Sequence, residues 1–166
     1  MAEEYCHFTC EMQVKIVSSC LLVAKPRTTS ARRSACPLNA SVEILGDRWS
    51  LLILRDMMLR NARTYKEFLD CAEGIATNIL ADRLRNLETH GIITSRPDPT
   101  DGRKQIYQLT RKGIDLAPVL TEMVLWAGRH ETVGNQPLIR LMQKDKEKFL
   151  AEIRRRWEDS AGAAGA

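Results

Sequence analysis

The chain has 166 residues, 44% of them hydrophobic and 28% charged, so it is long enough for one folded domain with terminal extensions and too short for two independent domains. Its longest nearly apolar stretch, residues 16–24, falls well short of the roughly 20 residues that span a bilayer, and acidic residues stand where an export signal would be basic. Five cysteines and a net charge of +4 fit a cytoplasmic protein with reduced thiols and no membrane partner.

The folded region is predicted to begin at Cys36-Pro37. Residues 1–35 carry one apolar patch followed by a polar run with a proline, which is typical of a linker, so we expect a poorly ordered N-terminal extension. Proline at position 37 suits a first helical turn, where its missing N–H would have no partner. The density of Leu, Ile and Met over residues 51–59 then predicts the most deeply buried helix of the domain.

Residues 64–91 predict two helices joined by a short turn, which is the spacing of a helix-turn-helix. Thr64, with Glu67 three residues later, is a capping box that should begin the first helix. The second helix is expected to begin near Ala76 and to end at His90-Gly91. Its isoleucines and leucines follow helical spacing, so one stripe of this helix should be buried.

A β-hairpin is predicted directly after these helices. Strand signals occur at residues 92–96 and 105–109, and the connection between them ends in Asp101-Gly102, which favours a tight turn. Helix followed by hairpin is the outline of a winged helix-turn-helix, a mostly α fold with a small β-hairpin. We expect three basic residues of the hairpin to contact DNA phosphates: Arg96, Arg103 and Lys104. Asp98 and Asp101 offset their charge, so the alternative is a solvated hairpin tip.

The second helix of the motif has an outer face that suits a DNA major groove. That face comprises Thr77, Asn78, Ala81, Asp82 and Arg85. Asparagine can pair with adenine, and arginine with guanine or phosphate, so we expect Asn78 and Arg85 to contact DNA; the alternative is a merely solvated face. Arg60 and Arg63, just before the motif, are further candidates for phosphate contacts.

One long helix is predicted after the hairpin, capped by Thr110 and continuing to about Arg129. A glycine and a proline then break the chain before a last helix in the C-terminal extension, residues 132–166. A run of three arginines in that helix is either solvated or in contact with DNA flanks. We expect the large apolar residues of the last helix to pack against a second subunit: Phe149, Ile153 and Trp157.

Several stretches of the chain stand in a distinctive order: Cys36-Pro37, ILGDRWSLLILRDMM, FLDCAEGIATNILADRLRNLETHGII and YQLTRKGIDLAPVL. In this order they resemble the HxlR-type winged helix-turn-helix regulators of bacteria. The resemblance defines a DNA-binding domain at residues 36–131. It implies a transcriptional repressor, not an enzyme, that binds double-stranded operator DNA as a homodimer formed by helices at both ends of the domain and answers to a small-molecule or redox effector.

The chain departs from this family at the start of its recognition helix. Where members often have a capping hydroxyl residue, this chain has Ala76, so we expect Thr77 to provide the cap one residue later. Ala81 and Asp82 stand where many members carry polar or basic residues. Residues 36–131 also contain equal numbers of basic and acidic residues. These features keep open the alternative of a winged-helix adaptor that binds a protein and no DNA.

The sequence offers little for catalysis. It contains no paired carboxylates or nucleophile at motif spacing and no Gly-rich phosphate loop, so we expect neither enzymatic activity nor a cofactor. Cys6, His7 and Cys10 do not complete a tetrahedral zinc site, so no metal is expected. Four large apolar residues are expected in the core, with an effector pocket between subunits as the alternative: Trp49, Met57, Met58 and Trp126.

Cys36 is the candidate redox sensor, with an inert thiol as the alternative. It stands where a helix begins, and the partial positive charge at a helix N-terminus favours the thiolate. The family resemblance implies the same, since some members sense oxidants or electrophiles through a cysteine in this Cys-Pro position. We expect Cys36→Ser to abolish any change in operator binding caused by peroxide or quinone, measured by gel shift. An unchanged response in the variant would exclude this role.

Overall fold

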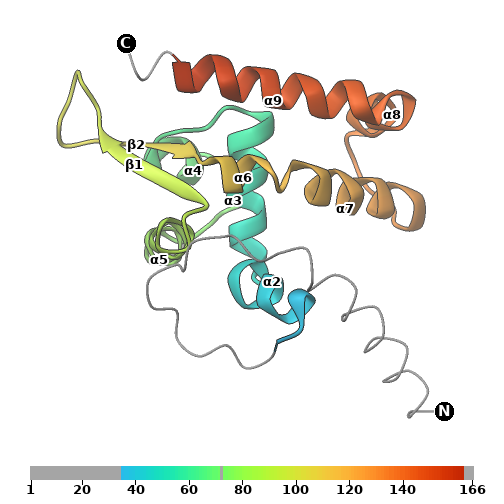
Figure 1. Cartoon of the computed structure of the whole chain (residues 1–166), viewed down its shortest axis with the longest axis horizontal. Coiled ribbons are helices and arrows are strands. Elements are labelled where there is room, and N and C mark those ends of the chain that lie inside the picture. The colour runs from blue at the N-terminus through green and yellow to red at the C-terminus, as the bar shows by residue number, and fades with distance from the viewer. Residues whose placement is uncertain (1–34, 72, 163–166) are drawn as a thin grey trace, which may run out of the picture. The chain divides into compact units, whose positions relative to one another are not determined.

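The computed structural model describes residues 35–71 and 73–162, which belong almost wholly to the compact unit Cys36–Ala166. The expectations for residues 1–34, including the cysteines and histidine near the N-terminus, lie outside the described residues. The elements are α2 Pro37–Leu45, α3 Arg48–Leu59, α4 Tyr65–Leu69, α5 Thr77–Thr89, β1 Ile93–Pro97, β2 Gln105–Leu109, α6 Arg111–Ile114, α7 Ala117–His130, α8 Gln136–Lys144 and α9 Lys146–Gly162. This order, with one antiparallel hairpin, confirms the predicted winged helix-turn-helix (Figure 1). None of the described helices is long and apolar enough to cross a membrane.

The centre of the domain is α3. Its N-cap residue Asp47 accepts hydrogen bonds from the backbone N–H groups of Trp49 and Ser50, both at 2.9 Å. Leu54 is completely buried, and Met57 and Met58 are buried with it, so the prediction of a deeply buried helix is confirmed. Because α3 contacts both α5 and α7, it joins the helix-turn-helix to the C-terminal helices.

The helix-turn-helix forms as its sequence predicts. Thr64 accepts from the backbone N–H of Glu67, and the Glu67 carboxylate accepts from the N–H of Thr64 at 2.8 Å, which completes the capping box. On α5 the leucine stripe is buried: Leu80, Leu84 and Leu87. The opposite side of α5 is thereby turned to the outside.

The hairpin is fixed to both helices of the motif. Its strands pair in register from Ile93 with Leu109 to Pro97 with Gln105. Ser95 donates through its backbone N–H and its hydroxyl to one carboxylate oxygen of Glu88 on α5, at 3.1 and 2.7 Å. On the other edge, the backbone N–H of Tyr107 donates to the carbonyl of Arg63 at 2.7 Å. The wing and α5 therefore form one unit.

The prediction of a single helix after Thr110 is wrong. Thr110 does cap a helix, since its hydroxyl accepts from the Gly113 N–H at 3.1 Å, but that helix, α6, ends at Ile114. Pro118 lies in the first turn of α7. A continuous helix would place the proline ring against the carbonyl of Ile114 and would lose a hydrogen bond. One helix therefore ends at Ile114, and a second helix begins at Ala117.

The single last helix is likewise two helices. Asp145 has an extended backbone, with φ −157°, and separates α8 from α9. Its carboxylate accepts from the backbone N–H of Lys148 at 2.9 Å, so it caps α9. The break lets α9 fold back over the domain on the side of the hairpin away from α5 (Figure 1).

The expectation that α9 packs against a second subunit is wrong for Ile153, which is buried in its own chain, and stays a prediction for the partly exposed Phe149 and Trp157. These side chains pack inside their own subunit, in a cluster with Met58 and Ile114. The Trp157 Nε1–H donates to the carbonyl of Leu109 at 2.8 Å, which ties α9 to the end of β2. Burial of an apolar face within one chain needs no association, so intramolecular docking satisfies Ile153.

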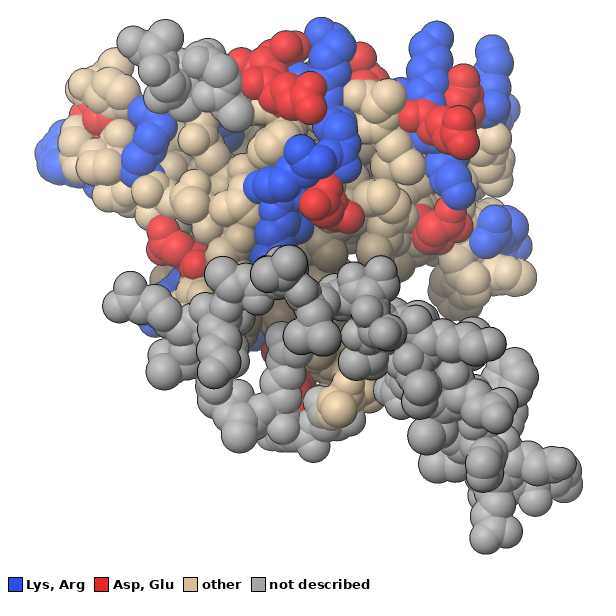
Figure 2. Space-filling model, in the orientation of Figure 1, with Lys and Arg blue, Asp and Glu red and all other residues tan. Residues whose placement is uncertain are grey.

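The run of arginines in α9 is compensated by acids. Arg154 lies 2.9 Å from Asp115, and Arg155 pairs with Glu152 and Asp159 at 2.7 and 3.0 Å. Figure 2 shows basic and acidic side chains interspersed along this helix. The arginine run is thus a paired, solvated face rather than a concentrated positive patch.

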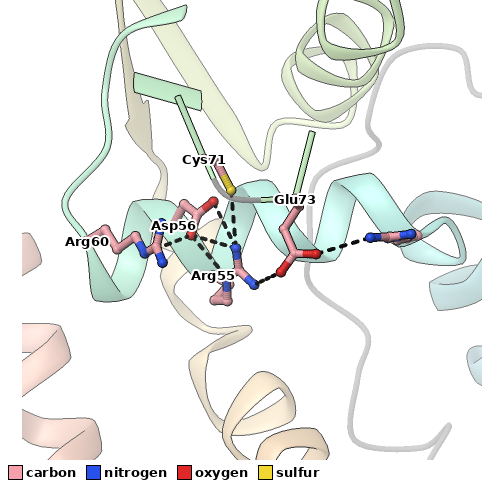
Figure 3. A network of polar contacts seen from close by, with 6 residues as sticks. Arg55, Asp56, Arg60, Cys71 and Glu73 are labelled. Carbon is pink, nitrogen blue, oxygen red and sulfur yellow. Dashed lines mark hydrogen bonds and ion pairs between the residues drawn. The ribbon is translucent and has the colours of Figure 1, made fainter. Parts of the chain in front are cut away.

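A polar network holds the turn between α4 and α5 against α3 (Figure 3). The Asp56 side chain, only 4% exposed, lies 2.9 Å from Arg55, and Arg55 also reaches Glu73 at 3.0 Å. Hydrogen bonds from Arg55 and Arg48 lower the pKa of Glu73. Burial alone would lower the pKa of Arg55, but its bonds to Asp56 and Glu73 outweigh burial and raise it. Both partners are therefore held in their charged forms.

We expect Asp56→Ala to lower the free energy of unfolding by about 3 kcal/mol, because it leaves the half-buried Arg55 guanidinium without its nearest carboxylate. Urea denaturation measures the change. The matched control is Glu122→Ala, which removes an exposed acid paired with Lys146 at 2.7 Å and should cost at most about 1 kcal/mol. Equal effects of the two variants would contradict a stabilising role for the network.

Candidate nucleic-acid interface

The outer face of α5 lies at the surface, as predicted. Thr77, Asn78, Asp82 and Arg85 are exposed, and Ala81 is half-buried. The side chains of Asn78 and Arg85 have no hydrogen-bond or ion-pair partner within residues 35–71 and 73–162. Both polar groups are thus available to a partner molecule, while the leucines on the opposite side hold the helix in place.

The expectation that Thr77 caps α5 is wrong. The N-cap residue is Ala76, which offers no side-chain hydrogen bond, and Thr77 is already the first helical residue. The Thr77 carbonyl instead accepts from the Tyr65 hydroxyl at 2.6 Å, which ties the start of α5 to α4. The first N–H groups of α5 therefore have no side-chain cap, and such a helix end suits an anion such as a phosphate.

Asp82 is not an isolated negative charge on this face. Its carboxylate is paired with Arg83, and Arg83 also lies 3.3 Å from Asp47, the N-cap of α3. Burial alone would raise the pKa of Asp47, but hydrogen bonds from Ser50 and Arg83 outweigh burial and lower it. The role of Arg83 in pairing with Asp82 was not predicted from the sequence. Its position next to Asp82 in the chain was the signal that could have indicated it.

The tip of the wing carries two exposed cations around one acid. The Arg103 side chain is 91% exposed with its Nε 3.0 Å from Asp101, and the Lys104 Nζ lies 3.4 Å from the same carboxylate. Hydrogen bonds from Arg103 lower the pKa of Asp101, so this acid stays charged. Asp98 lies in the same loop, so two acids offset the two cations, and the tip offers an exposed guanidinium and an exposed ammonium group without a net charge.

Arg96 is not brought together with those residues. Side chains alternate along a strand, and Ser95 points to α5, so Arg96 lies on the hairpin face turned away from α5. Its Nε is buried and has no hydrogen-bond partner among the described residues. The sequence already placed Arg96 in a strand and the other two residues in the connection, but it did not show which face of the hairpin Arg96 occupies.

Arg60 and Arg63 also lie apart from α5 and the wing tip. Arg60 ends α3, and its Nε is 3.6 Å from Asp56. The Arg63 guanidinium donates to the Asn61 side-chain oxygen at 2.9 and 3.1 Å and lines a groove beside α9. Their contact with DNA remains a prediction.

The two described cysteines occupy different environments. Cys36 is exposed at the N-cap of α2. Cys71 is half-buried, with its sulfur 3.4 Å from Arg55, and burial raises its pKa. A raised pKa lowers the fraction of Cys71 that is thiolate at neutral pH. Cys71 is therefore a weaker nucleophile than an ordinary cysteine, as expected of a structural thiol.

Two further helices, α2 and α7, each expose large apolar side chains. These side chains are Leu38, Val42, Val119, Met123 and Trp126. Trp126 is 54% exposed, so the expectation of a core residue is wrong, whereas Met57 and Met58 are buried as expected. On α7 the exposed apolar residues Val119, Met123 and Trp126 are four and three positions apart. This helical spacing was the signal in the sequence that they share one face of the helix. Exposed apolar surfaces of this kind suit a protein partner.

The chain is similar to known regulators over the same region. Residues 44–134 match the family model described as HxlR-like helix-turn-helix. An uncharacterized HTH-type transcriptional regulator of Synechocystis is 40% identical over 88 residues, which cover 53% of this chain and 64% of that relative. The HTH-type transcriptional regulator YodB of Bacillus subtilis is 34% identical over 93 residues, covering 55% of this chain and 82% of YodB.

A solved structure supports the same comparison. The crystal structure of PA1607, a candidate transcription factor, is 36% identical with a TM-score of 0.57, and the match covers 65% of this chain and 74% of that one. The family match ends at residue 134, so α8 and α9 lie outside it.

Proposed function

The chain belongs to the HxlR-like helix-turn-helix family, and on this premise we propose that it is a transcriptional repressor that binds operator DNA as a homodimer. The observation that carries the proposal is the outer face of α5, where the side chains of exposed Asn78 and Arg85 have no partner among the described residues, together with a wing whose tip exposes Arg103 and Lys104. A DNA reader needs this combination of donors that reach base edges and cations that reach the backbone.

In the proposed complex, α5 enters the major groove. Arg85 would donate two hydrogen bonds to a guanine, and Asn78 would pair with an adenine, each good bidentate contact supplying about 1–3 kcal/mol of discrimination. The uncapped N-terminus of α5 would approach a phosphate, because its N–H groups and its helix dipole both favour negative charge. Thr77, Ala81 and Asp82 complete the face that meets the groove.

The wing would hold the backbone beside that groove. Arg103 and Lys104 are the exposed cations of the hairpin tip, and phosphate contacts position a protein on DNA without reading the DNA sequence. Because the wing is hydrogen-bonded to α5 through Ser95 and Glu88, a phosphate contact at the tip would also fix the orientation of the recognition helix.

The exposed apolar side chains of α2 and α7 support the homodimer. The helix α7 lies near the end of the family match and α2 lies mostly before its start, and the exposed side chains of both are left uncovered by the described residues. A dimer would present two copies of α5 to a pseudo-palindromic operator, about 34 Å apart. A small rotation between subunits, caused by an effector, would misalign one helix with its groove.

We expect Arg85→Ala to weaken operator binding by about 1–3 kcal/mol and to relax the preference for one base pair. Selection from random duplexes supplies the operator, and fluorescence anisotropy supplies the affinity. The matched control is Arg155→Ala, an exposed and ion-paired arginine of α9, which should bind as the unaltered protein does. Equal losses in the two variants would contradict recognition through α5.

The wing variants should behave differently. Arg103→Ala and Lys104→Ala are expected to weaken binding to all duplexes alike, and each should reduce the salt dependence by about one released counterion. Titrations at several salt concentrations measure that slope. A protein-binding adaptor would show no salt-dependent affinity for any duplex, and this result would favour the adaptor over the repressor.

A further inference from the structure

A groove of about 390 Å³ lies between the end of α3, β2 and α9. Small-molecule sites commonly occupy roughly 300–1,000 Å³, so this α9 groove has the volume of a ligand site. Part of its wall comes from α9, which lies outside the family match and on the side of the hairpin away from α5 (Figure 1). The groove shares only Arg63 with the residues expected to contact DNA, and it includes none of the exposed apolar residues of α2 and α7.

Two guanidinium groups line the α9 groove. Arg63 hydrogen-bonds through its side chain to the neutral Asn61. Arg156 donates to the Met58 carbonyl at 3.4 Å, and its Nε is 3.9 Å from Glu152. Among the described residues that line the groove the only acid is Asp159, and its carboxylate lies 3.0 Å from Arg155. The lining therefore carries net positive charge with incompletely matched donors.

The remaining lining is largely apolar. It includes Met57, Met58, Ile114, Ile153 and Trp157. The Trp157 ring is held in place by the bond from its Nε1 to the Leu109 carbonyl. Gln108 also lines the groove, and its Nε2 is buried with no partner in the part of the chain that the structure describes. Small-molecule sites are usually lined by apolar side chains together with a few polar groups.

We propose that the α9 groove binds a small organic anion with an aromatic or aliphatic body. The carboxylate would lie between Arg63 and Arg156, since guanidinium groups form strong paired hydrogen bonds with carboxylates. The body would pack on Met58, Ile153 and Trp157. A neutral ligand would not use the net positive charge of the lining, and an anion without an apolar body would leave the apolar wall in water.

Isothermal titration calorimetry of the full chain with three probes tests this chemistry. We expect 1-naphthoate to bind at one site per chain. Naphthalene-1-carboxamide, which has the same body without the charge, should bind roughly tenfold more weakly or worse, and acetate should show no binding. No binding of 1-naphthoate at millimolar concentration, or equal binding of the amide, would overturn the proposal.

Variants locate the site. Arg63→Gln and Arg156→Gln should each weaken 1-naphthoate binding by roughly tenfold, whereas Arg140→Gln, an exposed arginine of α8 outside the groove, should leave it unchanged. Thermal unfolding without ligand checks that each variant is folded. If one groove variant does not fold, the other one alone still tests the site. Unchanged binding in a folded groove variant would overturn the proposal. The assay contains no DNA, so its result is independent of the proposed function.

Discussion

The outward display of α5 depends on the burial of its leucine stripe. Leu80, Leu84 and Leu87 are buried in the core that α5 shares with α3 and Ile93 of β1. Burial of one such side chain contributes roughly 1.5–3 kcal/mol, so the stripe fixes the rotation of the helix about its own axis. With that rotation fixed, Asn78 and Arg85 face outward. The candidate interface is thus a consequence of what the other side of the helix buries.

Electrostatic and hydrogen-bond contacts then fix where α5 begins and how the wing is oriented. The network around Asp56 holds the turn before α5 to α3, and Arg83 links α5 itself to the N-terminus of α3. Glu88 bonds to Ser95 on the hairpin. The same few contacts therefore position both the helix that would read bases and the strands that would hold phosphates.

The C-terminal extension changes which surfaces are available. Because Asp145 ends α8 and begins α9, the last helix folds back and buries Ile153 within the subunit. Three apolar residues of α7, Val119, Met123 and Trp126, remain exposed and can serve association. The returning helix also forms one wall of the α9 groove, so an element outside the family domain creates a feature that the domain alone would lack.

The sequence by itself determined the features that depend on neighbouring residues in the chain. The Thr64 capping box, the leucine spacing of α5, the start of α2 at Pro37 and the cap at Thr110 all follow from local hydrogen bonds and helical periodicity. These features suffice for a winged helix-turn-helix and for an outward α5. The Pro118 break was readable in principle, because it too is local.

Only the tertiary structure decided the features that depend on residues far apart in the chain. The sequence placed Arg96 in a strand, but only the hydrogen bonds of the neighbouring Ser95 to α5 show that Arg96 lies on the opposite face of the hairpin. Trp157 and Trp126 both lie on apolar helix faces, yet one docks on the end of β2 and the other stays exposed. The apolar face of a helix predicts that the face is buried, but it does not show which surface covers it. The path of the whole chain decides whether that surface is the subunit's own core or a partner.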